Sequence, residues 1–117
     1  MAKFVVSKSA SRKLFFELRK YIDRVIHEES LSASYEAGNE YSLNDVDVFV
    51  DVYERHSAIG GNRLSLSVTA LYHEGNIDIT AVTSGGSSGI FLKINRFGED
   101  YFMELFEKII DKFFEEA

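Results

Sequence analysis

The sequence predicts a two-layer α+β sandwich in which an N-terminal and a C-terminal helix cover one face of an antiparallel sheet of five to six strands. The first observation is that apolar residues recur at spacings of three and four near both ends of the chain. The second is that apolar and polar residues alternate through its middle, as in strands with one buried face. The expected order is β-α-β-β-β-β-β-α, in one domain that spans residues 1–117.

The N-terminal part of the chain predicts a short strand followed by a basic amphipathic helix. Residues 3–6 are apolar and β-branched, which favours a strand. Ser7 or Ser9 then supplies the N-cap, and the helix is expected to end near residues 27–29. The predicted buried face of this helix consists of Leu14, Phe15, Leu18, Tyr21, Ile22, Val25 and Ile26.

The next part of the chain predicts two strands. Residues 30–36 alternate between apolar and polar, and residues 37–39 are typical of a turn. The clearest strand covers residues 46–53, where valine occupies every second position. Because side chains alternate across a strand, the valines are predicted to share the buried face. The residues between them are then expected to point away from the helices.

Residues 64–72 and 77–81 predict a β-hairpin, since Glu74-Gly75 suits a two-residue turn between them. The resulting register pairs Tyr72 with Ile77, Ala70 with Ile79, and Val68 with Ala81. All of these residues lie on the apolar face, so the turn and the hydrophobic pattern specify the same register.

The C-terminal part predicts a Gly/Ser-rich connection over residues 83–89, a last strand over 90–94, and a long helix. Glu99 and Asp100 are expected at the N-terminal end of this helix, where negative charge is favourable. Its apolar face is predicted to contain Tyr101, Phe102, Leu105, Phe106, Ile109, Ile110, Phe113 and Phe114.

The composition restricts the classes of function. The chain has no Cys, which excludes disulfides, thiolate metal sites and a cysteine nucleophile and favours a reducing compartment. Its net charge of −6 argues against nucleic acid as the main partner. The first residues lack the apolar run of a signal peptide, and no window approaches the about 20 apolar residues of a membrane span. We therefore expect a cytoplasmic protein with no membrane association.

Charge is distributed unevenly along the chain. Residues 1–24 carry a balance of +5, and residues 99–117 carry a balance of −5. Two solvated helix faces of opposite sign that lie near each other account for this distribution. The alternative is a basic patch on the first helix that meets an acidic partner.

The residue types that carry chemistry do not form a recognisable catalytic or metal-binding motif. His27, His56 and His73 lack metal-ligand spacing and are interpreted as solvated. Ser87 lies in a Gly-x-Ser-x-Gly pattern by letter, but without the strand and helix that such an elbow needs. The acids Glu40, Asp45, Asp47, Asp51 and Glu54 are interpreted as a solvated face. Catalysis would need a convergent group, and the first residues to consider are Asp47, Tyr53, Arg55 and Asp78. No cofactor is expected.

Two candidate binding regions follow from the pattern. The Gly/Ser-rich connection is similar to loops whose backbone N–H groups bind anions, although a plain hairpin connection gives the same composition. Its candidate ligand-binding residues are Ser84, Gly85, Gly86, Ser87 and Ser88.

The second region is the sheet face that the helices leave uncovered. Apolar residues are mixed with polar ones there, which indicates either a partner surface or ordinary cross-strand pairing. The candidate interaction residues are Asp47, Phe49, Tyr53, Arg55, Leu71 and Thr80.

Two segments carry a resemblance to a known family. Residues 52–57 with 61–66, and residues 80–87, resemble a family of short bacterial proteins of unassigned function, over a span from Lys3 to about residue 110. The resemblance implies a bacterial, cytoplasmic protein and no particular activity. The order of elements is also similar to helix-grip ligand-binding domains, which hold a cavity between the sheet and the C-terminal helix, but likeness of fold does not establish function.

Together, these features favour a small cytosolic protein that acts as a non-enzymatic interaction domain and self-associates as a homodimer. The alternative is a module of helix-grip type that binds a small molecule or an anion. The second reading predicts a cavity of a few hundred cubic ångströms, and a tightly packed core without one would count against it.

Overall fold

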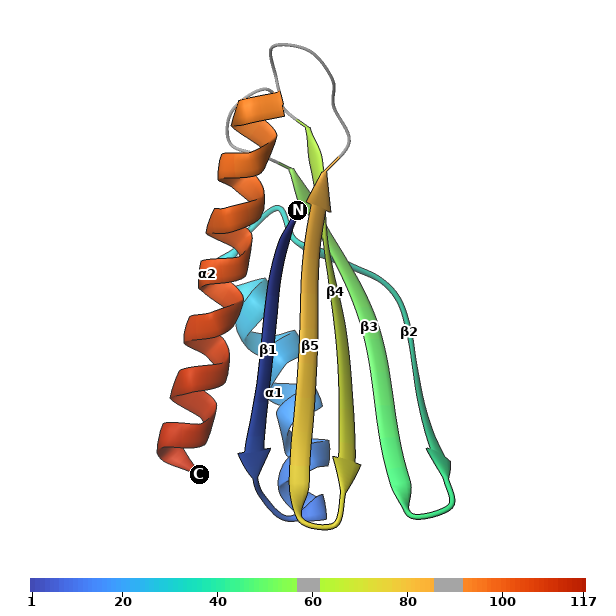
Figure 1. The fold of residues 1–117 in the computed structure, drawn as a ribbon. Helices are drawn as coiled ribbons and strands as arrows, with labels where there is room; N and C mark the ends of the chain where they lie inside the picture. Colours follow the sequence, from blue (N-terminus) through green and yellow to red (C-terminus); the bar gives the residue numbers. More distant parts are fainter. Residues whose placement is uncertain (57–61, 86–91) are drawn as a thin grey trace.

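The computed structural model describes residues 1–56, 62–85 and 92–117, with side chains in the last helix from residue 98 onward. Its elements are β1 (Ala2–Ser9), α1 (Arg12–Glu29), β2 (Ser34–Leu43), β3 (Val46–His56), β4 (Arg63–His73), β5 (Asn76–Gly85) and α2 (Leu92–Glu116). The strands form one sheet in the order β1-β5-β4-β3-β2 (Figure 1), and every neighbouring pair is antiparallel. The predicted α+β fold class is therefore confirmed, with five strands in the described sheet.

The two helices pack on one face of the sheet, and the core lies between the layers. After β1, the chain passes through α1 and returns at the opposite edge of the sheet as β2. Tyr21 of α1 meets Phe113 of α2 with ring centroids 5.1 Å apart, and Phe4 of β1 meets Phe106 of α2 at 6.1 Å. The fully buried side chains in the described parts of the helices include Phe15, Leu18, Ile22, Ile26, Phe102, Phe106 and Ile110.

The β4–β5 hairpin has the predicted register. Tyr72 pairs with Ile77, Ala70 with Ile79, and Val68 with Ala81. At the turn, Glu74 has φ 48° and Gly75 has φ 81°. Positive φ at both central residues is typical of a type I′ turn, whose twist matches that of the flanking strands.

The predicted facing of β3 is wrong. The four valines do share one face, but it is the uncovered one, and of them only Val48 is buried, at 7% exposed. Asp47, Phe49, Asp51 and Tyr53 point toward the helices and are buried. Partners on α1 are the physical reason. Arg12 pairs with Asp47, and Arg19 pairs with Asp51. The ring of Phe15 packs against that of Phe49.

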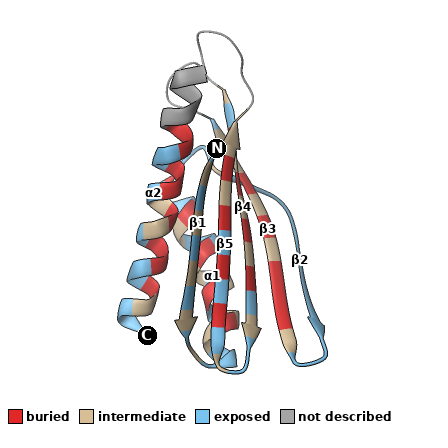
Figure 2. Ribbon diagram, viewed as in Figure 1, coloured by how far each residue is buried: buried red, intermediate tan, exposed pale blue. Residues whose placement is uncertain are grey.

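The strand predicted over residues 30–36, with a turn at 37–39, is also wrong. The strand in this region, β2, starts at Ser34, continues through Gly38 to Leu43, and is exposed along its whole length (Figure 2). A bulge at residues 35–37 interrupts its pairing with β3. The turn comes later, at Asn44, which has φ 54°.

The ends of the helices differ from the prediction. Because β1 continues to Ser9, the cap of α1 is Ser11, whose hydroxyl oxygen accepts a hydrogen bond from the Leu14 N–H at 3.2 Å. Of the strand expected at residues 90–94, residues 92–94 belong instead to α2, and 90–91 lie outside the described residues. Glu99 is therefore an interior, buried residue of α2, and not its first turn.

One predicted member of the apolar face of α2 is replaced by another residue. Tyr101 is 56% exposed, whereas Met103 is buried at 4%. The other predicted residues of this face pack into or against the core. No helix in the described part of the chain is long and apolar enough to cross a membrane.

Replacing Ser11 with Ala is expected to lower the free energy of unfolding by about 1 kcal/mol, because the first turn of α1 loses its cap. Urea denaturation measures this change. Ser9→Ala is the matched control, and we expect it to stay within about 0.5 kcal/mol of the unmodified chain. A larger loss in the free energy of unfolding for Ser9→Ala than for Ser11→Ala would contradict the assignment of Ser11 as the N-cap.

Candidate functional site

A line of polar contacts joins one flank of α1 to the inward face of β3. Arg12 Nε lies 2.8 Å from Asp47 Oδ2 at one end of this line. Near the other end, the Tyr53 hydroxyl donates a hydrogen bond to Asp23 at 2.9 Å. We call this set the α1–β3 ladder, and its residues are Arg12, Arg19, Asp23, Asp47, Asp51 and Tyr53.

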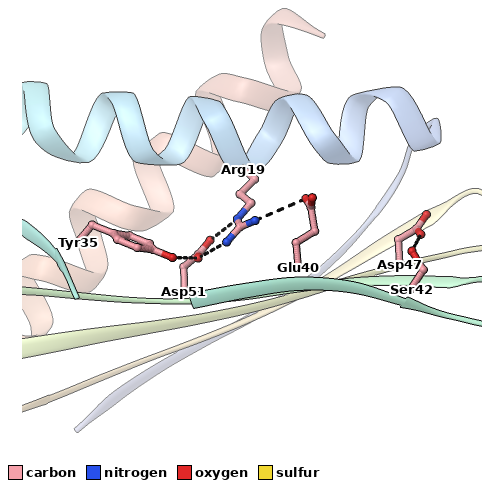
Figure 3. A network of polar contacts seen from close by, with 6 residues as sticks. All are labelled: Arg19, Tyr35, Glu40, Ser42, Asp47 and Asp51. Carbon is pink, nitrogen blue, oxygen red and sulfur yellow. Dashed lines mark hydrogen bonds and ion pairs between the residues drawn. The ribbon is translucent and has the colours of Figure 1, made fainter. Parts of the chain in front are cut away.

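The centre of the ladder is a buried ion pair between Arg19 and Asp51 (Figure 3). Arg19 donates from Nε to Oδ2 at 2.9 Å and from Nη2 to Oδ1 at 2.7 Å. The Tyr35 hydroxyl donates to Asp51 Oδ1 at 2.9 Å, and Glu40 lies 3.7 Å from Arg19 Nη1. The bidentate bond to Asp51 raises the pKa of Arg19 above its usual value. Asp51 is only 2% exposed, and a charge this deep persists because both of its oxygens are bonded.

Gly38 of β2 leaves the space that this ion pair occupies. A Cβ atom at this position would lie 2.0 Å from Asp51 Oδ1, 2.2 Å from the Tyr35 hydroxyl and 2.6 Å from the backbone oxygen of Val50. Gly38 pairs directly with Asp51 across the sheet. The glycine is therefore required for space at this point of the strand, and the network could not form over a residue with a side chain.

The second polar group surrounds Tyr53, which is 1% exposed. Burial, followed by the hydrogen bond to Asp23, raises the pKa of Tyr53 above its ordinary value of 10.0. His27 Nδ1 lies 2.7 Å from the backbone oxygen of Asp23 and must donate there, since a carbonyl oxygen only accepts. The Tyr35 ring packs edge-on against Tyr53, with centroids 5.4 Å apart.

These groups line a cleft of about 370 Å³ between α1 and the β2–β3 edge of the sheet. Its lining residues are Arg19, Lys20, Asp23, His27, Tyr35, Asp51 and Tyr53. The volume lies within the usual range of ligand pockets. No group of three or more His, Asp or Glu side chains within the described ranges could hold a metal ion.

Among the described residues, both helices lie on this one side of the sheet, and none lies on the opposite side. Leu71 and Thr80 lie there, as predicted, together with the valines of β3. We call this surface the uncovered face. Its apolar and threonine residues are Val5, Tyr41, Leu43, Val46, Val48, Val50, Val52, Thr69, Leu71, Thr80 and Val82.

The other predicted members of that face point the opposite way. Asp47 and Tyr53 belong to the ladder, and the Phe49 ring packs 5.2 Å from that of Phe15 in α1. Arg55 lies over Tyr101 and Phe102 of α2, with its guanidinium 4.9 and 4.8 Å from the ring centres. Burial against these rings lowers the pKa of Arg55. The prediction that Asp47, Phe49, Tyr53 and Arg55 lie on the uncovered face is therefore wrong.

The Gly/Ser-rich region is described only in part. Ser84 and Gly85 form the end of β5, and the Ser84 hydroxyl lies 2.7 Å from that of Ser65 on β4. A second cavity of about 240 Å³ lies beside this contact. Gly86, Ser87 and Ser88 lie outside the described residues, so anion binding by this loop stays a prediction.

Sequence reasoning missed Arg19, Tyr35 and Gly38 as parts of one site. A signal was present in the spacing of Arg12 and Arg19, which are seven residues apart and so lie on one side of a helix. Two aspartates on one strand face, Asp47 and Asp51, match them from the sheet.

Replacing Gly38 with Ala is expected to lower the free energy of unfolding by about 2 kcal/mol, because the new methyl group clashes with backbone as well as with the ion pair. Thermal and urea unfolding measure the loss. Ser32→Ala, in the exposed turn before β2, is the control and should change stability by less than about 0.5 kcal/mol. Equal stability of the Gly38→Ala protein and the unmodified chain would contradict this geometry.

Comparison with known proteins gives one family. No curated protein matches the chain. Residues 1–114 match a family described as "Family of unknown function (DUF6054)", which covers nearly the whole of the fold described above. The chain therefore belongs to the DUF6054 family.

Proposed function

We propose that this protein is a non-enzymatic interaction domain that self-associates, and that a second copy of the chain covers the uncovered face. The observation that carries this proposal is a sheet face with exposed apolar side chains that neither described helix covers. Within that face, Leu43 is 66% exposed, Val5 62%, Tyr41 48% and Leu71 37%. Exposed apolar surface of this kind is typical of interaction sites.

The size of the uncovered face supports a stable dimer. Its strands are 8 to 11 residues long, and five of them lie side by side. At about 3.3 Å per residue and about 4.8 Å between strands, the face covers about 800 Å². A stable protein–protein interface buries about 800 Å² on each partner. A second copy therefore supplies a surface of matching size and character, and sheets commonly pack face to face about 10 Å apart.

The bonding of the polar groups around Asp51 and Tyr53 supports a non-enzymatic role. Arg19 and Tyr35 both donate hydrogen bonds to Asp51, and Tyr53 donates one to Asp23. The bonds within the network hold these side chains in place and occupy both oxygens of the central carboxylate. We further propose a bacterial, cytoplasmic setting, supported by the absence of Cys and by the family resemblance of the sequence.

Charged substitutions on the uncovered face are expected to separate the dimer. Val50→Asp and Leu71→Asp each place a carboxylate in the apolar centre, so sedimentation velocity should show monomer where the unmodified chain sediments as a dimer at micromolar concentration. Leu31→Asp is the control, since Leu31 is 99% exposed and lies outside the sheet. Circular dichroism checks that each variant is folded.

The unmodified chain must itself be dimeric for this proposal to hold. A monomer at high micromolar concentration would contradict it. A second contradicting result would be that Val50→Asp and Leu71→Asp dimerise with the same dissociation constant as Leu31→Asp.

A second candidate function is small-ligand binding in the cleft beneath α1. Its supporting observation is the cavity of about 370 Å³, which combines the rings of Tyr35 and His27 with the cation of Lys20. Arg19 also lines this cavity but is already paired with Asp51. This cavity lies by α1 and the β2–β3 edge, and not against the C-terminal helix as in the helix-grip arrangement. A small aromatic carboxylate suits such a lining, because its ring can stack and its charge can meet a cation.

Benzoate is the probe for this second candidate. In a ¹H–¹⁵N NMR titration, we expect saturable shifts at residues 19–27 and 35 that are lost in Lys20→Ala. Lys13→Ala is the control, because Lys13 is 87% exposed on α1 and does not line the cleft. Shifts spread evenly over the protein, or none at millimolar benzoate, would contradict ligand binding at the cleft.

A further inference from the structure

We infer that the two-fold axis of the dimer runs across the strands, through the residues Asn39, Val50, Thr69, Thr80 and Val5, so that each strand lies antiparallel over its own copy. This inference rests on the proposed self-association through the uncovered face. The axis specifies which residues of the two copies face each other across the interface.

The register of the sheet arranges the uncovered face in three central rows. The Tyr41 row contains Tyr41, Val48, Leu71, Asp78 and Ser7. The Val50 row contains Asn39, Val50, Thr69, Thr80 and Val5. The Val52 row contains Ala37, Val52, Ser67, Val82 and Lys3. Each row crosses all five strands, and the Val50 row lies in the middle.

A face-to-face dimer of this sheet has two simple choices for its two-fold axis, along the strands or across them. A face-to-face dimer has its two-fold axis in the plane between the two sheets. An axis along the strands and an axis across them both place one twisted, saddle-shaped surface on an identical saddle, so the twist does not separate them. The two axes differ in which side chains of the rows they bring together.

An axis across the strands places the larger side chains on smaller ones. Rotation about the Val50 row exchanges the Tyr41 row with the Val52 row of the partner, strand by strand. Tyr41 then meets Ala37 of the partner subunit, and Leu71 meets Ser67 of the partner subunit. Pairing large with small residues is how two facing layers interdigitate without voids.

The same axis pairs the only two charged residues of the three rows. Lys3 of one copy lies over Ser7 of the partner subunit, one strand from Asp78 of the partner subunit and thus about 5 Å to the side. Within one chain, these two residues are four positions apart along neighbouring strands, or about 13 Å, so they do not pair internally. Symmetry forms the contact twice in each dimer.

The alternative axis, along the strands, gives a worse match. It keeps each row on itself and reverses the order of the strands, so Asp78 lies over Val48 of the partner subunit and Lys3 over Ala37 of the partner subunit. Val48 is among the least exposed residues of the face, at 7%. Asp78 would then be desolvated over an apolar residue without a partner, which opposes association.

Two charge reversals test the axis because each places like charges together. Lys3→Glu alone sets Glu against Asp78, and Asp78→Lys alone sets Lys against Lys3, in both copies of the contact. We expect each variant to self-associate about tenfold more weakly than the unmodified chain. In an equimolar mixture of the two variants, both contacts of the mixed dimer become opposite pairs, so the dimer should recover to within about threefold. Sedimentation equilibrium of tagged and untagged chains measures all of these dissociation constants.

The outcomes separate the axis from the proposed function. Recovery in the mixture, with Lys13→Glu on α1 as a neutral control, supports the axis across the strands. An unmodified dimer whose two variants fail to recover on mixing overturns the axis and leaves self-association standing. An unmodified chain that stays monomeric overturns both.

Discussion

The burial of Asp51 beneath α1 is the constraint on which the rest of the structure depends. A carboxylate that is 2% exposed can remain ionised only with a cation beside it, and Arg19 supplies that cation through two hydrogen bonds. Once Asp51 points inward, the period of two along the strand turns Asp47, Phe49 and Tyr53 inward as well. The same period turns the valines of β3 outward, where no helix covers them.

The ladder also explains the charge asymmetry of the chain. The basic residues of α1 were expected to lie near the acidic C-terminal helix. Arg12 and Arg19 instead pair with acids of the sheet, while the described contact between the helices is aromatic, as between Tyr21 and Phe113. The helices therefore meet through their apolar faces, and electrostatics positions α1 over β3.

The parts of the fold that the sequence predicts are those in which local signals agree. The β4–β5 hairpin was correct because Glu74-Gly75 and the apolar alternation specify one register. β3 could not be oriented from its own residues, since valines lie on one side and aromatics on the other, and both sides can be buried. The deciding partner, Arg19, lies 32 residues away in the chain. β2 was misplaced because Gly38 was read as a turn, whereas it provides space for Asp51 and Tyr35. Because β3 faces the other way, only Leu71 and Thr80 of the predicted interaction residues lie on the uncovered face.

The most direct test of this account is a double-mutant cycle on Arg19 and Asp51, measured as free energy of unfolding. Arg19→Ala, Asp51→Ala and the double variant give the coupling between the two side chains. We expect a coupling of about 2 kcal/mol, because Arg19→Ala leaves the carboxylate of Asp51 without its cation and Asp51→Ala leaves Arg19 without its carboxylate. A coupling below about 0.5 kcal/mol would mean that the two substitutions act independently, as exposed ion pairs do, and would contradict the claim that this contact orients β3.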